Sequence, residues 1–174
     1  MPALTTRQRL IKKLQWTFQV EGMNAFMFFG ILIFLNASYQ SVNLLFLSYG
    51  MLLMCFILMQ GTYYWWLKLS VINERPIFQR TSLLRFRKFK RINQIGLALI
   101  PLVLLIQWVI SGKQLSGDNF LFWAIFANVF AVLEYINYYH KQLMYDNSHD
   151  LKYLFYNKTL KEASLHKDLR ENKI

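Results

Sequence analysis

Four stretches of the chain are almost entirely apolar, and short polar or basic segments separate them. They run from Trp16 to Ala37, from Val42 to Leu67, over residues 94–111 and over residues 119–140. A helix needs about 20 residues to cross the hydrocarbon core of a bilayer. The pattern therefore predicts an all-α integral membrane four-helix bundle, built from two transmembrane hairpins.

The first apolar stretch also has the general form of a cleavable signal peptide, because basic residues precede it. Three features favour a retained transmembrane helix. The stretch is longer than the roughly 7–15 apolar residues of a signal core, it contains Glu21 and Asn24, and Leu35 stands where cleavage after Ala37 would need a small residue. We expect residues 1–141 to form one membrane domain with four spans, followed by a polar, partly helical tail at 142–174.

Basic residues are distributed unevenly between the segments that flank the apolar stretches. The chain has 20 Lys and Arg against 9 Asp and Glu, which gives a formal net charge of +11. All of the basic residues except Lys113 lie before the first stretch, between the second and third, or after the fourth. Because Lys and Arg in short loops stay on the cytoplasmic side, we predict cytoplasmic N- and C-termini and a multi-pass protein of the plasma membrane. The basic content then needs no nucleic acid as a partner.

Small residues mark one face of the second and fourth stretches. In the fourth, Ala124, Ala127 and Ala131 recur at helical spacing and continue through Glu134 and Tyr138. The second carries Ser48, Cys55 and Thr62, seven residues apart. Lipid provides no hydrophobic force between helices, so close approach at small residues must hold them together. We expect both faces to point into the bundle.

Two acidic residues lie inside the apolar stretches. Glu21 and Glu134 each stand about two turns from the basic end of their stretch, so antiparallel packing would place them at similar depth. Other polar residues at this level are Asn24, Gln60, Asn137 and His140. A carboxylate at membrane depth must be paired, hydrated or protonated. These six residues are the predicted intramembrane polar cluster.

Three roles are open for this cluster. The favoured one is a charge-paired clasp that fixes the register of the helices. Its basic partners would be Lys12, Lys13, Lys68, Arg91 and Lys141. The second role is a site that binds a proton or an ion, and the third is snorkelling of the carboxylates to water.

The segment between the second and third stretches is a candidate amphipathic helix. After Pro76, Thr81 or Ser82 is a suitable cap for a helix that continues into the third span. Its basic residues are Arg85, Arg87, Lys88, Lys90 and Arg91, interleaved with Leu83, Phe86 and Phe89. Anionic headgroups attract basic residues near the surface by about 1 kcal/mol each. We interpret the segment as a basic patch that contacts anionic lipid headgroups, with a docking site for a protein partner as the alternative.

The tail contains two short amphipathic patches. The first comprises Leu151, Leu154 and Phe155, and the second runs from Leu160 to Leu169. They could lie on the membrane or cover the mouth of the bundle, and a solvated tail is an equal alternative.

Several classes of membrane enzyme are excluded by counting residues. Cys55 is the only cysteine, so a dithiol relay within the chain is impossible. The histidines, His140, His149 and His166, lie at or after the end of the fourth stretch and cannot supply paired haem ligands within the spans. No GxSxG, HExxH or phosphate-loop motif occurs. We therefore predict no catalytic residue, metal site or cofactor.

In size and number of spans, the chain resembles the small multidrug transporters, which use a glutamate in the first span, and the flippase-like proteins of glycan pathways. The resemblance covers architecture alone, and no motif of either family aligns with these residues. The sequence favours a non-enzymatic small subunit, scaffold or regulator whose cytoplasmic face contacts anionic lipid, a protein partner or a second copy. The alternative is a small oligomeric transporter or channel-like protein that uses Glu21 and Glu134 for proton or cation coupling.

Overall fold

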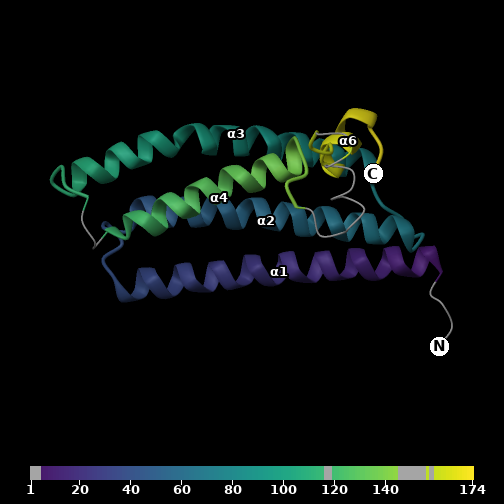
Figure 1. Cartoon of the computed structure of the whole chain (residues 1–174), viewed down its shortest axis with the longest axis horizontal. Coiled ribbons are helices and arrows are strands. Elements are labelled where there is room, and N and C mark those ends of the chain that lie inside the picture. Colours follow the sequence, from purple (N-terminus) through teal and green to yellow (C-terminus); the bar gives the residue numbers. More distant parts are fainter. Residues whose placement is uncertain (1–4, 116–118, 145–155, 157–158) are drawn as a thin grey trace.

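The computed structural model describes residues 5–115, 119–144, 156 and 159–174, and Figure 1 shows how they are arranged. The described residues form five helices: α1 (Thr6–Ser38), α2 (Leu45–Ile72), α3 (Gln79–Ile110), α4 (Leu121–Tyr139) and α6 (Ser164–Glu171). Four of them, α1 to α4, are long and apolar enough to cross a membrane. The prediction of an all-helical chain with four candidate spans is therefore confirmed.

Three of the long helices extend past their apolar stretches at the same end of the molecule. With 33 and 32 residues, α1 and α3 are each about 50 Å long at 1.5 Å per residue, whereas the hydrocarbon core is about 30 Å thick. In contrast, α4 has 19 residues and stops at Tyr139. We call the end that holds Thr6, Ile72, Gln79 and α6 the basic end, on the right in Figure 1, and the opposite one the far end.

The central helix is α2. It packs against α1, α3 and α4, and in Figure 1 it lies between α1 and α3. The most apolar part of α2 is 61% buried, against 11% in α1 and 11% in α3. A helix that is apolar all round is suited to such a central position. The outward apolar sides of α1 and α3 are the surfaces that lipid would cover.

The small residues of the second and fourth spans face other helices. Ala124, Ala127 and Ala131 of α4 are buried, in clusters with apolar residues of α2. On another side of α2, the Ser48 hydroxyl accepts a hydrogen bond from Asn36 Nδ2 of α1 at 2.9 Å. Both stripes therefore lie where helices approach one another, because small side chains let the backbones come close.

Two glycines of α2 mark its closest approaches to α4. A Cβ at Gly50 would overlap the side chain and the backbone nitrogen of Asn128, and a Cβ at Gly61 would overlap the Tyr138 hydroxyl. Gly30 of α1, by contrast, has no neighbour within 4 Å of the position of a Cβ. Only glycine fits at the first two positions without a shift of the helices.

The connector helix and the third span form one continuous helix, α3, as the sequence predicts. The expected cap is wrong, however. The residue before the helix is Phe78, whose side chain makes no capping hydrogen bond. Ser82 is buried, with its hydroxyl 3.4 Å from the Tyr63 hydroxyl. The helix starts before Thr81 and Ser82, and Leu83 and Phe86 in its first turns pack against α2.

The second amphipathic patch of the tail covers the basic end. Residues 159–174 include α6, which packs against α3 and α4, with Leu165 and Ile174 buried. An antiparallel bridge between Lys141 and Glu162 joins this segment to the chain that leaves α4. The first patch, with Leu151, lies outside the described residues. The part of α2 and α3 that projects beyond α4 is thus covered by α6.

Candidate functional site at the basic end

A ring of neutral hydrogen bonds joins α2, α3 and α4 at the level where α4 ends. Gln60 Nε2 donates to Asn93 Oδ1 at 3.0 Å, and Asn93 Nδ2 donates back to Gln60 Oε1 at 2.8 Å. The Tyr139 hydroxyl also donates to Gln60 Oε1, at 2.7 Å. All three side chains are buried. Gln60, predicted to lie with the glutamates, instead forms this amide ring with two residues that the prediction did not include.

The structure brings the two intramembrane acids together. Glu21 Oε1 accepts a hydrogen bond from Trp65 Nε1 at 2.7 Å. Glu21 Oε2 is buried and has no hydrogen-bond partner among the described residues, although the Tyr138 hydroxyl lies beside it. Glu134 is one turn from Tyr138 on α4, and the Tyr138 hydroxyl and Glu21 Oε2 both lie beside Gly61 of α2. Asn137 Nδ2 is 3.5 Å from Glu134 Oε2. We call Glu21, Glu134 and Tyr138 the acid cluster.

Lys68, one of the basic partners expected for this cluster, pairs with Asp168 of α6. Ion pairs of the described residues join Arg7 to Glu74, Lys68 to Asp168, Glu162 to Arg170 and His166, and Arg170 to Glu171. None of these pairs includes Glu21 or Glu134. The charge-paired clasp stays a prediction. The bond that the structure gives Glu21 is the one from the indole of Trp65.

Asn24 and His140 are separate from the acid cluster. Asn24 is half-buried one turn farther along α1. His140 directly follows α4, and its Nε2 is 3.3 Å from the Tyr135 hydroxyl. The His140 ring also stacks on that of His166, with ring centres 5.9 Å apart. Burial, together with the charges of Lys90 and His166, lowers the pKa of His140.

The C-terminal segment is anchored by Asp168. Its Oδ2 accepts a hydrogen bond from the Tyr64 hydroxyl at 2.7 Å and pairs with Lys68 Nζ at 2.7 Å. The Lys68 ammonium also lies 5.6 Å from the centre of the Tyr64 ring, within the range of a cation–π contact. On α4, the Tyr139 carbonyl lies 2.7 Å from His166 Nδ1. These contacts fix α6 against α2 and α4.

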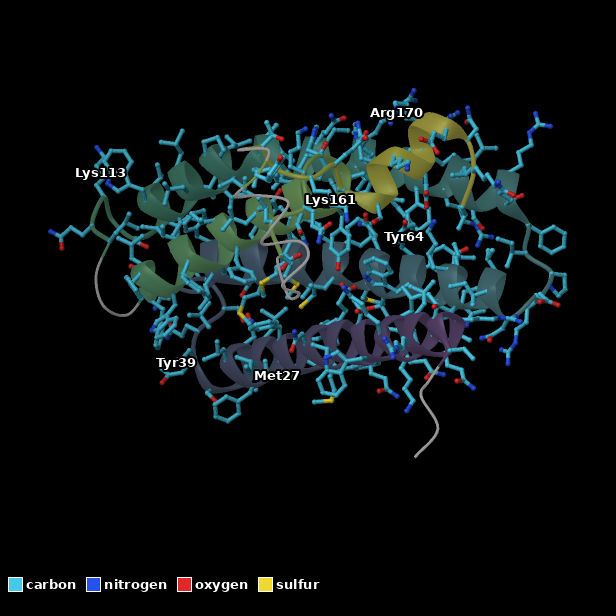
Figure 2. The ribbon with its side chains drawn as sticks, turned by 45° about the vertical axis from the view of Figure 1, so that its right-hand side comes forward. Met27, Tyr39, Tyr64, Lys113, Lys161 and Arg170 are labelled. Carbon is cyan, nitrogen blue, oxygen red and sulfur yellow. The ribbon has the colours of Figure 1, made fainter. Side chains whose placement is uncertain are left out.

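A cavity of about 640 Å³ opens at the basic end between α1, α2 and the C-terminal segment. Figure 2 shows Tyr64 and Lys161, two of its lining residues, near α6, and Lys113 at the opposite end of the molecule. Its charged lining residues are Lys13, Glu21, Lys68, Lys161, Lys167, Asp168 and Glu171. Because charges of both signs line it, this cavity has no clear preference for an anion or a cation.

The predicted basic patch lies on α3, mostly before the apolar stretch begins. Arg85, Arg87, Lys88 and Arg91 are exposed, and Lys90 is half-buried. Arg85 Nη1 is 3.4 Å from the Tyr63 hydroxyl, and Arg87 Nη2 donates to Asn172 Oδ1 at 2.5 Å. Ion pairs of the described residues do not include these five side chains, so their charge is available to anionic groups outside the chain.

Three buried amides at the far end were missed by the sequence analysis. Gln107 Oε1 accepts a hydrogen bond from the Phe46 backbone nitrogen at 3.2 Å, and Asn128 Nδ2 donates to the Phe46 carbonyl at 3.0 Å. Asn119 Nδ2 donates to the Asn43 carbonyl at 3.1 Å. These side chains satisfy backbone groups around the start of α2, whose N-cap residue makes no side-chain hydrogen bond. The sequence feature that could have identified these three amides is that each is a polar residue within an apolar stretch.

Comparisons with protein families, curated proteins and solved structures found no match for this chain. Its class therefore follows from the four helices that are long and apolar enough to span a membrane, which indicate a membrane protein. The described residues contain no group of three or more His, Cys, Asp or Glu placed to hold a metal ion.

Proposed function

We propose that the chain is a multi-pass protein of the plasma membrane with its basic end in the cytoplasm, and that it acts as a small non-enzymatic subunit, scaffold or regulator. One observation carries this proposal. Among the described residues, Lys113 is the only Lys or Arg at the far end, and the others belong to the basic end. Such asymmetry is the usual determinant of orientation in the membrane.

The basic end would contact anionic lipid headgroups through the basic patch of α3. These residues come just before the apolar part of the helix, where the cytoplasmic leaflet presents its anionic lipids. The long stems of Lys and Arg also allow their charges to reach that level. A protein partner or a second copy would dock on the same end, because the far end offers lipid-facing apolar sides and short loops.

Labelling of single cysteines in intact cells tests the orientation. The buried Cys55 is first replaced by Ser, and Phe78→Cys or Lys113→Cys is then added. Phe78 is 85% exposed at the basic end. A membrane-impermeant maleimide should label Lys113→Cys in intact cells and Phe78→Cys only after permeabilisation. Labelling of both positions from one side would overturn the proposed topology.

A second candidate function, a small oligomeric transporter or channel-like protein, is supported by the acid cluster. Among the described residues, no ion pair includes Glu21 or Glu134, and Glu21 Oε2 has no hydrogen-bond partner. Such a group suits a proton or a small cation. We rank this function second because the cluster lies near the basic end, whereas transporter sites usually lie near the bilayer midplane.

Proton flux into proteoliposomes that contain a pH-sensitive dye separates the two functions. If the protein conducts protons, Glu21→Gln and Glu134→Gln should slow the decay of an imposed pH gradient. Glu74→Gln is the matched control, because Glu74 is an exposed acid paired with Arg7 outside the cluster. Equal decay in all variants and in protein-free liposomes would contradict proton transport and leave the scaffold proposal in place.

A further inference from the structure

A second hollow, of about 460 Å³, lies between the start of α3 and Asn172, the residue that follows α6. Its lining residues are Gln79, Arg80, Leu83, Leu84, Arg87 and Asn172. Two guanidinium groups and two amides therefore surround it, and no carboxylate is among its lining residues. From this charge and shape, we infer that the hollow binds a phosphate group.

The spacing of the two arginines suits a shared anion. Arg80 and Arg87 are seven residues apart on one helix, so they lie on the same face and about 10.5 Å apart along the axis. Their long side chains can converge on a group bound between them. The planar guanidinium donates parallel hydrogen bonds that match the oxygens of a phosphate, which makes arginine better suited than lysine to this role.

The C-terminal segment completes the hollow and orients one arginine. Arg87 Nη2 donates to Asn172 Oδ1 at 2.5 Å, and Gln79 Nε2 lies 3.4 Å from the Asn172 carbonyl. A guanidinium has five N–H donors, so this bond leaves Arg87 with donors for a ligand. Arg80 makes no hydrogen bond or ion pair with the described residues. The docked C-terminal segment therefore contributes Asn172 to a hollow whose other lining residues belong to α3.

The hollow differs in charge from the larger cavity at the same end. Glu21, Asp168 and Glu171 line the larger cavity, and their carboxylates oppose an anion. The smaller hollow has a formal lining charge of +2, from its two arginines, and the leucines add an apolar side. Leu84 is 48% exposed and can contact the organic part of a phosphate compound. Charge complementarity thus selects this hollow for an anionic ligand.

Two sources supply the same chemistry: the headgroup of an anionic membrane lipid, or a soluble phosphate. A lipid source rests on the proposed function, since it requires the basic end to face an anionic leaflet. A soluble source does not depend on that orientation. The test therefore measures binding of a phosphate-bearing lipid and of soluble phosphate.

The experiment uses thermal unfolding of the full chain in neutral detergent at constant ionic strength. The added probes are dioctanoyl phosphatidic acid, dioctanoyl phosphatidylcholine and inorganic phosphate. We expect phosphatidic acid to raise the unfolding temperature and phosphatidylcholine to leave it unchanged. Stabilisation by inorganic phosphate as well would identify a site for free phosphate, whereas stabilisation by phosphatidic acid alone would identify a lipid site.

Matched variants locate the binding. Arg80→Gln combined with Arg87→Gln should weaken the apparent affinity for phosphatidic acid at least tenfold. The control, Arg9→Gln combined with Arg75→Gln, removes the same charge from exposed positions of the basic end that belong neither to the hollow nor to the basic patch, and it should change the affinity less than twofold. Arg80→Gln alone keeps the Arg87 contact with Asn172. It therefore tests binding in a variant whose folding does not depend on the loss of that contact. It should still weaken binding several-fold.

Two results would overturn the site. If the control pair weakens binding as much as the hollow pair, only the overall positive charge of the basic end matters. In that case the contact with anionic lipid stands while the site is wrong. If no probe stabilises the unaltered protein, the hollow is not a phosphate site, and the cysteine labelling still decides the proposed topology independently.

Discussion

The far end and the basic end both hold α2 against its neighbours, but they do so with different chemistry. At the far end, Gln107 and Asn128 bond to backbone groups of α2, and Gly50 lets α4 approach closely. At the basic end, Asp168 pairs with Lys68, and the acid cluster places carboxyl groups of α1 and α4 near the Tyr138 hydroxyl. The far end has the properties of a structural core, whereas the basic end leaves polar groups and space for other molecules.

The surroundings of each end explain this difference. A polar group surrounded by lipid cannot bond to water, so an unpaired one is costly. Neutral side chains that bond to one another avoid that cost. At the basic end the helices project past the end of α4, and charged groups there can be hydrated. Binding functions are therefore expected at the basic end.

The largest expected effects come from filling the close contacts of α2 with α4. Gly50→Ala should lower the free energy of unfolding by about 3 kcal/mol, the upper part of the range for overpacking, because the new Cβ meets the Asn128 backbone, which cannot move alone. Gly61→Ala should cost about 1–3 kcal/mol. Denaturation in detergent measures both. Gly30→Ala is the control and should be neutral or slightly stabilising.

Gln60 and Asn93 of the amide ring, at the boundary between the two ends, should contribute to the free energy of unfolding cooperatively. Gln60→Leu or Asn93→Leu each leaves a buried partner unsatisfied, so each should cost about 1–3 kcal/mol of unfolding free energy. The double variant should cost less than the sum of the two, because it removes both partners. Additive costs in a double-mutant cycle would show that the two amides do not interact.

Weakening the contacts of α6 should change hydrogen exchange at the basic end alone. Asp168→Asn removes the ion pair with Lys68, so hydrogen exchange in α6 should become about tenfold faster, equivalent to about 1.4 kcal/mol. Exchange in the apolar part of α4 should not change. Glu171→Gln, at a more exposed position of the same helix, should have little effect. Faster exchange throughout the molecule would show that the two ends are not independent.

The smallest expected effect is a dependence on pH at the junction of α4 and α6. The pKa of His140 in the folded chain lies below its ordinary value of 6.5, so the unfolded chain takes up this proton more readily. The stability contributed by the neutral form is present above pH 6.5 and is lost as the pH falls through the lower folded pKa. His140→Gln should reduce the loss of thermal stability between pH 7.5 and pH 5.5. An unchanged loss would exclude His140 as its cause.

The lengths of the apolar stretches were sufficient to predict the long helices, because the formation of a spanning helix depends on local sequence. Glu21 and Glu134 could be placed at one depth by counting turns from the basic segments. The partners of Glu21 could not be predicted in this way. Trp65 stands near the end of the second apolar stretch, and only the rotation of α2 against α1 brings its indole to the carboxylate.

The amide ring and the phosphate hollow could not be predicted from the sequence either. Gln60, Asn93 and Tyr139 come from three helices, and their meeting depends on the rotation of each helix about its axis. The hollow needs Asn172, which is 85 residues from Arg87 along the chain. Patterns within a single helix carry no information about such contacts.

The shortness of α4 has a consequence for the order of assembly. Because α4 stops at Tyr139, the projecting part of α2 and α3 presents a vacant slot, and α6 fills it. The segment that fills this slot follows all four membrane helices in the chain. During synthesis, Tyr64 and Phe86 therefore stay uncovered by α6 until all four long helices have been made, and the hollow lined by Asn172 can form only after them.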